Sequence, residues 1–370
     1  MSMKIAVLGA GSIGTYVGAS LAASGMNVVL IGRAKMQASI RTHGVTLTDL
    51  AGRRQILAPE QIRYELAPQA LNDADLILVT VKSAASASAA MEIAQHARRD
   101  ALVVSLQNGI GNADVLQHGL KLAFTRHQAQ TEASTAANIT AKPPTASQEK
   151  MAMPTVLGGM VPFNVVQMAN GRLHRGTFGE LTIQAHPQLE AWQQAFAAAY
   201  LPLLQARDFP ALQWGKLLLN LNNPLNALSD LPLKTELAHR AWRQCLALLM
   251  DEALQVLKEA QIHPAKVAAV PASWLPTVLR LPDPLFKLAA GKMLKIDPEA
   301  RSSMWEDLQA GRATEIDFIN GAVTALAARH GMQAPANQRV VDLIHQAGSG
   351  GQRTWRGDDL YRACHSALPA

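Results

Sequence analysis

The sequence predicts an α/β protein that begins with a doubly wound parallel sheet and continues as an all-helical domain. Apolar strand-like runs alternate with helix-like runs over roughly the first 200 residues, which is the pattern of a parallel sheet with crossover helices. From Asp208 onward the pattern is helical, with few strand signals. At 370 residues the chain is long enough for two domains with separate cores.

A glycine-rich turn follows the first strand. Residues 5–8 are apolar, and a helix pattern then extends to residue 23, before a second apolar strand at 28–31. The turn between them consists of Gly9, Ala10, Gly11, Ser12, Ile13 and Gly14. In a Gly-x-Gly-x-x-Gly turn, the first glycine permits the bend, the second lets backbone approach a pyrophosphate, and the third lets helix pack on strand. The helix N-terminus attracts the phosphates, so we predict a Rossmann-type dinucleotide site.

The end of the second strand indicates which dinucleotide binds. NAD-dependent enzymes usually carry an acid there to accept hydrogen bonds from the ribose 2′-hydroxyl. Here Gly32 and Arg33 are followed by Lys35, and the next carboxylate is Asp49. A guanidinium binds a 2′-phosphate through charge-assisted hydrogen bonds, so we predict NADPH with Arg33 on that phosphate. The alternative is a solvated arginine at a strand end.

Two further strands end in polar residues. Residues 74–82 and 101–107 have the apolar pattern of buried strands, and Lys82 and Asn108 lie at their ends. Ligands of doubly wound sheets bind beyond the carboxyl ends of the strands, so both residues fall where a ligand would bind.

The other segments of the first domain are less regular. Alternating residues predict an antiparallel hairpin at 44–57, and 171–183 is predicted to be a closing hairpin. Residues 123–153 lack apolar periodicity, so we expect an inserted surface loop, poorly ordered or capped by a short helix. We place the NADPH-binding domain at 1–206 and the helical substrate domain at 207–370, with the chemistry in the cleft between them.

The helical domain contains five main predicted helices and a proline-rich passage of short helices. The helices are 214–223, 238–260, 304–309, 315–330 and 337–345, and the proline-rich passage is 264–298.

One of these helices carries a lysine and three amides in an apolar setting. At 100° per residue, Lys216, Asn220 and Asn223 share one face, whereas Asn222 points elsewhere. A lysine near a carbonyl can act as a general acid, with burial bringing its pKa nearer the working pH. The alternative is a lysine that reaches solvent while the amides cap or bridge helices.

A second polar cluster lies further along the chain. Ser302 and Ser303 precede one predicted helix, and Thr314, Glu315 and Asp317 lie at the start of the next. Helix capping and the helix dipole account for each of these residues without any function: Thr314 or a neighbour can cap, and both acids suit a first turn.

Composition excludes several classes of function. Cys245 and Cys364 lack metal spacing and the eleven histidines form no ligand cluster, so we expect no metal. Basic residues are dispersed and aromatics make up 5%, so the net charge of +6 indicates attraction of small anions rather than nucleic acid. No apolar run is long enough to span a membrane and no secretory signal is evident, so we expect a cytoplasmic protein.

In this combination the sequence resembles the ketopantoate reductase family (2-dehydropantoate 2-reductase). The resemblance implies a C-terminal domain like that of 6-phosphogluconate dehydrogenase. It also implies NADPH-dependent reduction of 2-dehydropantoate to (R)-pantoate, on the route to pantothenate and coenzyme A, by a monomer or homodimer. The motifs that carry it are the 9–14 loop, 80–82, 107–111, 157–159, 214–217, 301–304 and 314–321.

The family's catalytic and substrate-binding roles fall on residues of the helical domain. By resemblance, Lys216 is the proton donor, and Glu315 lies near the cofactor ribose and that lysine. Asn220, Asn223 and Ser303 correspond to residues that hold the substrate.

The resemblance also assigns two residues at the cofactor, and the chain departs from the family pattern in two ways. Asn108 corresponds to an asparagine between cofactor and substrate, and Lys82 to a lysine at the nicotinamide side. Familiar members place the second helix asparagine eight residues after the lysine, whereas Asn223 follows Lys216 by seven. Some members carry one further substrate-contacting asparagine near the position of Leu233 and another, just before the two serines, at the position of Ala300. Two alternatives stay open: an oxidoreductase of another 2-keto or hydroxy acid, and a non-catalytic NADPH-binding regulator.

Overall fold

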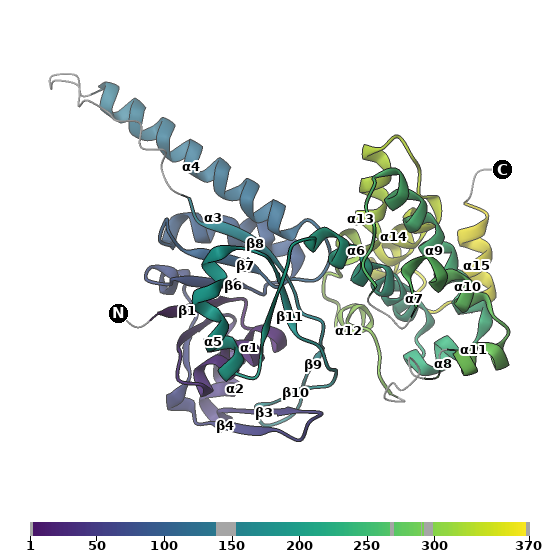
Figure 1. Ribbon diagram of the computed structural model, residues 1–370, viewed down its shortest axis with the longest axis horizontal. Coiled ribbons are helices and arrows are strands. Elements are labelled where there is room, and N and C mark those ends of the chain that lie inside the picture. The colour runs from purple at the N-terminus through teal and green to yellow at the C-terminus, as the bar shows by residue number, and fades with distance from the viewer. Residues whose placement is uncertain (1–2, 138–152, 267–269, 290, 292–298, 368–370) are drawn as a thin grey trace. The chain divides into compact units, whose positions relative to one another are not determined.

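The computed structural model describes residues 3–137, 153–266, 270–289, 291 and 299–367 (Figure 1). The chain forms two compact units, residues 1–209 and residues 210–370, and each is described by itself. No helix in the part of the chain so described is long and apolar enough to cross a lipid bilayer.

The first unit is built on an eight-stranded sheet. The order across the sheet is β12 (Leu203–Ala206), β11 (Leu181–Gln184), β8 (Thr155–Met160), β7 (Leu102–Ser105), β6 (Leu76–Val79), β1 (Lys4–Leu8), β2 (Asn27–Ile31) and β5 (Arg63–Glu65). The six neighbouring strands from β8 to β5 are parallel to one another. At the other edge, β11 is antiparallel to β8, and β12 is parallel to β11.

Helices cover both faces of this sheet, which explains why β6 is wholly apolar and why β1 and β7 each carry only one polar residue. In β1, Ile5 and Val7 belong to the core shared with α1 (Ser12–Ala23) and α5 (Glu190–Ala198). Ala6 and Leu8 point to the other core, shared with α3 (Ser86–His96) and α4 (Asn112–Ala137). The remaining helix of this unit, α2 (Ala34–His43), follows β2.

A second, four-stranded sheet lies in the same unit, in the order β4 (Arg54–Leu57), β3 (Val45–Asp49), β10 (Arg172–Arg175) and β9 (Val165–Gln167). The β3–β4 pair confirms the hairpin predicted at 44–57. The hairpin predicted at 171–183 is wrong, because β10 pairs with β9 and β3, whereas β11 joins the large sheet. Two strands that follow each other in sequence therefore belong to different sheets.

The loop predicted at 123–153 is also wrong in its first half. α4 continues as a helix to Ala137, and residues 138–152 lie outside the described part of the chain (Figure 1). Periodicity gave no sign of this helix, because alanine and glutamine favour a helix by intrinsic propensity without any apolar face.

The described part of the second unit is helical. Its helices are α6 (Phe209–Asn220, which starts at the last residue of the first unit), α7 (Asn222–Ser229), α8 (Leu233–Ala238), α9 (Arg240–Glu259), α10 (Leu275–Arg280), α11 (Asp283–Ala289), α12 (Ser303–Gln309), α13 (Ile316–Arg329), α14 (Pro335–Gly348) and α15 (Gly357–His365). α10 and α11 confirm the short helices predicted in the proline-rich passage, of which residues 267–269, 290 and 292–298 lie outside the description.

The helix predicted at 214–223 is divided into α6 and α7 at Leu221. Pro224 lies in the first turn of α7. A proline lacks the N–H for the bond to the carbonyl four residues earlier, here that of Asn220, and its ring clashes with that carbonyl. The break therefore falls between the two asparagines expected to hold substrate.

Candidate functional site

The turn after β1 requires glycine at two positions. Gly9 has φ +103°, and a Cβ there would collide with the backbone of Val81. A Cβ on Gly14 would collide with Thr80 Oγ1, which itself donates a 2.8 Å hydrogen bond to the carbonyl of Gly9. The loop after β6 therefore packs directly against this turn and fixes its shape.

Gly11, by contrast, faces open space among the residues described. A Cβ on Gly11 would meet only the carbonyl oxygen of Gly9, at 3.9 Å. Gly11 is the N-cap of α1, and its own carbonyl accepts the hydrogen bond from Thr15 N at 2.8 Å. The first N–H groups of α1 have no partner within the helix, so this turn fits the phosphates of a dinucleotide.

Arg33 is exposed and occupies the N-cap position of α2, without a side-chain capping bond, shortly after β2. The first turn of α2 contains no acidic residue. Tyr64 Oη donates a 3.2 Å hydrogen bond to the carbonyl of Arg33, and a Cβ on Gly32 would collide with that hydroxyl. Burial raises the pKa of Tyr64 to about 12, so its hydroxyl stays a donor and holds the backbone of Arg33 in place.

Lys82 and Asn108 lie on loops that hydrogen bonds join together. Ser83 Oγ donates to the carbonyl of Asn108 at 3.0 Å, and Asn112 Nδ2 donates to the same carbonyl at 2.7 Å. Gln107, which is buried, donates from Nε2 to the carbonyl of Val81 at 3.1 Å. The structure therefore brings the loops after β6 and β7 to one place at the carboxyl edge of the sheet.

In the second unit, Lys216 is half-buried on α6 and Glu315 is buried before α13. Burial lowers the pKa of Lys216 to about 8, and the negative charge of Glu315 opposes that shift. Glu315 occupies the N-cap position of α13 without a side-chain capping bond, so Thr314 is not the cap. The structure thus places the lysine under the direct influence of this carboxylate.

The three amides near Lys216 differ in their surroundings. Asn220 ends α6 and Asn223 lies in α7, both partly exposed. Asn223 shares the face of Lys216 only in one continuous helix, and the break at Leu221 interrupts that helix. Asn222 is buried, and its side chain hydrogen-bonds the carboxyl group of Glu236.

The two serines before α12 have separate roles. Ser302 is buried and is the N-cap, with Oγ accepting a 3.1 Å hydrogen bond from Trp305 N. Ser303 is exposed and is the first residue of the helix. Capping therefore accounts for Ser302 and leaves Ser303 accessible.

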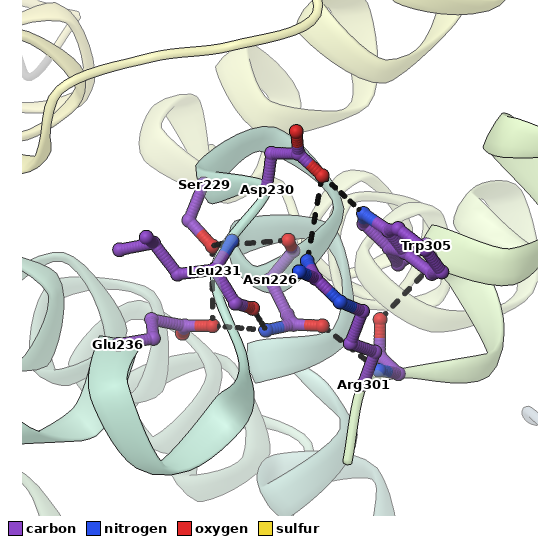
Figure 2. A network of polar contacts seen from close by, with 8 residues as sticks. Asn226, Ser229, Asp230, Leu231, Glu236, Arg301 and Trp305 are labelled. Atoms are coloured by element: carbon purple, nitrogen blue, oxygen red, sulfur yellow. Dashed lines mark hydrogen bonds and ion pairs between the residues drawn. The ribbon is translucent and has the colours of Figure 1, made fainter. Parts of the chain in front are cut away.

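A buried polar network beside these serines was not predicted from the sequence (Figure 2). Asn226 Nδ2 donates to Glu236 Oε2 at 2.5 Å, and Asn226 Oδ1 accepts from Ser302 N at 2.8 Å. Burial raises the pKa of Glu236 to about 8. In the sequence, Asn226 stands out as a polar residue within an apolar helix, and this pattern could have identified it. Glu236 lies in a charged, amphipathic stretch, where an acidic residue is expected and does not stand out.

Leu233 and Ala300 lie side by side. Leu233 N donates a 2.9 Å hydrogen bond to the carbonyl of Ala300. This backbone bond joins the start of α8 to the segment just before α12.

Two sequence models of one family together match most of this chain. Residues 5–188 match the model described as ketopantoate reductase PanE/ApbA, and residues 208–348 match the model of its C-terminal part. A relative from Halobacterium salinarum, named 2-dehydropantoate 2-reductase, is 26% identical over 353 residues, which cover 93% of this chain and 99% of the relative.

Solved structures share the fold. A PanE/ApbA family ketopantoate reductase from Ralstonia eutropha gives a TM-score of 0.73 at 25% identity, covering 94% of this chain and 99% of that one. D-mandelate dehydrogenase with NADH and anilino(oxo)acetate gives 0.69 at 19% identity, with the same coverage, and shares the fold alone. These structures confirm the predicted class, a Rossmann-type sheet followed by a helical unit like that of 6-phosphogluconate dehydrogenase. Because both parts of the family model match, the chain belongs to the ketopantoate reductase family.

Proposed function

We propose that this oxidoreductase reduces 2-dehydropantoate to (R)-pantoate with NADPH, in the synthesis of pantothenate and coenzyme A. The observation that carries the proposal is the pair of Lys216 and Glu315. A partly buried lysine with a pKa near 8, influenced by a buried carboxylate, is suited to giving a proton to a carbonyl oxygen at neutral pH.

The first unit supplies the residues that would hold NADPH. The turn from Gly9 to Gly14 would bind the pyrophosphate, since the space beside Gly11 is open and the N–H groups of α1 begin there. Arg33 would bind the 2′-phosphate, Lys82 would lie at the nicotinamide side, and Asn108 would lie between cofactor and substrate. When bound, NADPH supplies the hydride that reduces the C2 carbonyl.

The second unit supplies the acid. Lys216 donates the proton that the carbonyl oxygen gains, and it is mostly charged below pH 8 because of its pKa. Glu315 favours the charged form of Lys216 and orients it. Asn220, Asn223 and Ser303 hydrogen-bond the carboxylate and hydroxymethyl ends of the keto acid, and this orientation supplies much of the rate.

The test is the loss of turnover in Lys216→Ala. We expect single-turnover NADPH oxidation with 2-dehydropantoate to slow by roughly two to four orders of magnitude, the range for general acid catalysis. NADPH binding, measured by fluorescence, should survive. Lys216→Arg should rescue poorly, because a guanidinium hardly releases a proton at neutral pH.

Lys234→Ala is the matched control, since Lys234 is an exposed lysine of the same unit. It should turn over at the wild-type rate. Undiminished turnover in Lys216→Ala would contradict the proposed role of the lysine. A wild-type protein that reduces no 2-keto acid would instead favour the non-catalytic NADPH-binding regulator.

A related reductase of another 2-keto acid is the second candidate. The observation that favours it is that Leu233 and Ala300 adjoin each other. By the resemblance, some members of the family carry substrate-contacting asparagines near these two positions. A panel of 2-keto acids with polar and apolar side chains decides between the two, by comparing kcat/KM for each acid.

A further inference from the structure

We propose that Glu236 is a positioning residue, which holds the start of α12 against α7 so that Ser303 and Asn223 can bind the keto acid. This inference rests on the proposed function, because it assigns these two residues to substrate. Glu236 itself is fully buried on α8 and lies inside the protein rather than at a surface where a substrate could reach it.

The connection runs through two hydrogen-bonded steps. Asn226 of α7 donates from Nδ2 to Glu236 Oε2 at 2.5 Å and to the carbonyl of Leu231 at 2.9 Å. With its amide nitrogen held in this way, Asn226 directs Oδ1 at the backbone N–H of Ser302, at 2.8 Å. Glu236 therefore fixes the orientation of the Asn226 side chain. That side chain joins α7 to the beginning of α12 through a buried hydrogen bond (Figure 2).

Ser302 carries the connection on to Asn223. Its hydroxyl donates to the carbonyl of Asn223 at 3.1 Å and also accepts from Trp305 N as the helix cap. Ser303 is the next residue after Ser302. The main chain at both proposed substrate-binding residues is thus tied to a single buried network.

An exposed set of contacts joins the same two segments from the other side (Figure 2). Trp305 Nε1 donates to Asp230 Oδ1 at 2.7 Å, and Arg301 lies over the Trp305 ring at 4.3 Å from its centroid. Asp230 adopts a left-handed conformation, with φ +55°, at the end of α7. Solvent weakens such surface contacts, so we assign the positioning to the buried side.

The chemistry of the acid suits a fixed structural role. Burial raises the pKa of Glu236 to about 8, so the carboxyl group is largely neutral at pH 7. A neutral carboxyl still accepts from Asn226, and it avoids the cost of an unpaired buried charge. Glutamine offers the same acceptor in the same shape, which provides a conservative variant for the test.

The test compares Glu236→Ala with Glu236→Gln in the full chain. We expect Glu236→Ala to raise the KM for the keto acid about tenfold, as for a lost buried hydrogen bond, with kcat changed far less and NADPH affinity unchanged. Glu236→Gln should keep the wild-type KM. Ser302→Ala removes the bond to Asn223 and should also raise the KM. It replaces Glu236→Ala in the test if that variant does not fold.

Glu252→Ala is the matched control. Glu252 is also a buried acid of this unit, but it binds the start of α14 rather than α7 or α12. We expect it to lower stability without changing the KM. Any of three results would overturn the proposal. The KM could rise equally in Glu252→Ala, it could stay unchanged in both Glu236→Ala and Ser302→Ala, or it could rise in Glu236→Gln as well.

Hydrogen exchange separates this inference from the proposed function. Amides at the start of α12 should exchange about tenfold faster in Glu236→Ala, or in Ser302→Ala, than in Glu252→Ala, because local opening follows the lost contacts. This result needs no substrate, so it tests the network even if the wild-type protein reduces no keto acid. Equal exchange at α12 in these variants would overturn the positioning role.

Discussion

Lys216 lies half-buried on α6, where two effects act on its ammonium group in opposite directions. Burial lowers its pKa to about 8, and the charge of Glu315 limits that fall. A group that donates a proton must carry that proton before the reaction. Under the proposed function, the pH dependence of turnover therefore reports on this pair.

Under the proposed function, we expect kcat/KM to be constant at neutral pH and to fall as pH rises through about 8, because Lys216 of the free protein then loses its proton. Glu315→Gln removes the charge that raises the pKa of Lys216. The midpoint of the fall should then move to lower pH, by about one unit. The pH profile of kcat/KM, from NADPH oxidation at limiting keto acid, measures both midpoints.

Asp317→Asn is the control for this shift, since Asp317 is an exposed acid two residues further along the chain. Its profile should match that of the wild type. A Glu315→Gln profile with an unmoved midpoint would contradict the electrostatic role of Glu315.

Arg33 is the residue on which cofactor choice depends under the proposed function. Arg33→Asp removes a cation and adds repulsion, so NADPH binding should weaken by about 1.5–3 kcal/mol, as for hydrogen bonds to charged groups. NADH binding should be unchanged or improved. Dissociation constants from fluorescence titration give both values.

Arg41→Asp makes the same change of charge at an exposed position near the other end of α2. It should leave the preference for NADPH intact. A wild-type preference for NADH, or equal losses in the two variants, would show that Arg33 does not read the 2′-phosphate.

At the scale of elements, side chains from one helix complete the ends of another. Glu252 of α9 accepts hydrogen bonds from Ala336 N at 2.8 Å and from Asn337 N at 2.9 Å, in the first turn of α14. Asn337 Nδ2 also donates to this carboxylate at 2.9 Å. A buried acid thus satisfies N–H groups that the helix cannot satisfy itself.

Glu252→Ala leaves these buried donors without partners, so it should destabilise the protein by about 2–5 kcal/mol, as for a broken buried charged network. Denaturant unfolding followed by circular dichroism measures the change. Glu259→Ala, an exposed acid at the end of the same helix, should change stability by less than about 0.5 kcal/mol. Similar losses for the two variants would refute the capping role.

At the scale of the whole molecule, the chain consists of two compact units, residues 1–209 and residues 210–370. Most residues proposed to hold NADPH belong to the first, whereas Glu315, the proposed acid Lys216 and most proposed substrate residues belong to the second. A ligand stabilises the structure that it binds, by about 2.7 kcal/mol at a hundred times its dissociation constant.

NADPH should therefore protect amides of the first unit from hydrogen exchange much more than those of the second. Exchange in β1 and β6 should slow, whereas exchange in α9 should change little. Mass spectrometry of peptides from the full chain, with and without NADPH, gives this comparison. If exchange slowed only in α9, or did not slow in β1 and β6, the cofactor would not bind at the first unit.

Much of the fold follows from local sequence. The apolar strands and the glycine turn predict the sheet, because a strand buried on both faces and a turn with positive φ at Gly9 each require particular residue types. The pairing of β10 and the helix at 123–137 could not be predicted, since pairing depends on distant partners and propensity leaves no periodic pattern.

The sequence by itself determined the class of fold, the family, and the residue types offered for cofactor and proton transfer. Only the tertiary structure decided which of them meet. Glu315 acts on Lys216 across about 100 residues of sequence, and Glu236 reaches Ser302 through Asn226. Burial by distant segments sets the pKa of Lys216 and of Glu236, and no local pattern records that burial.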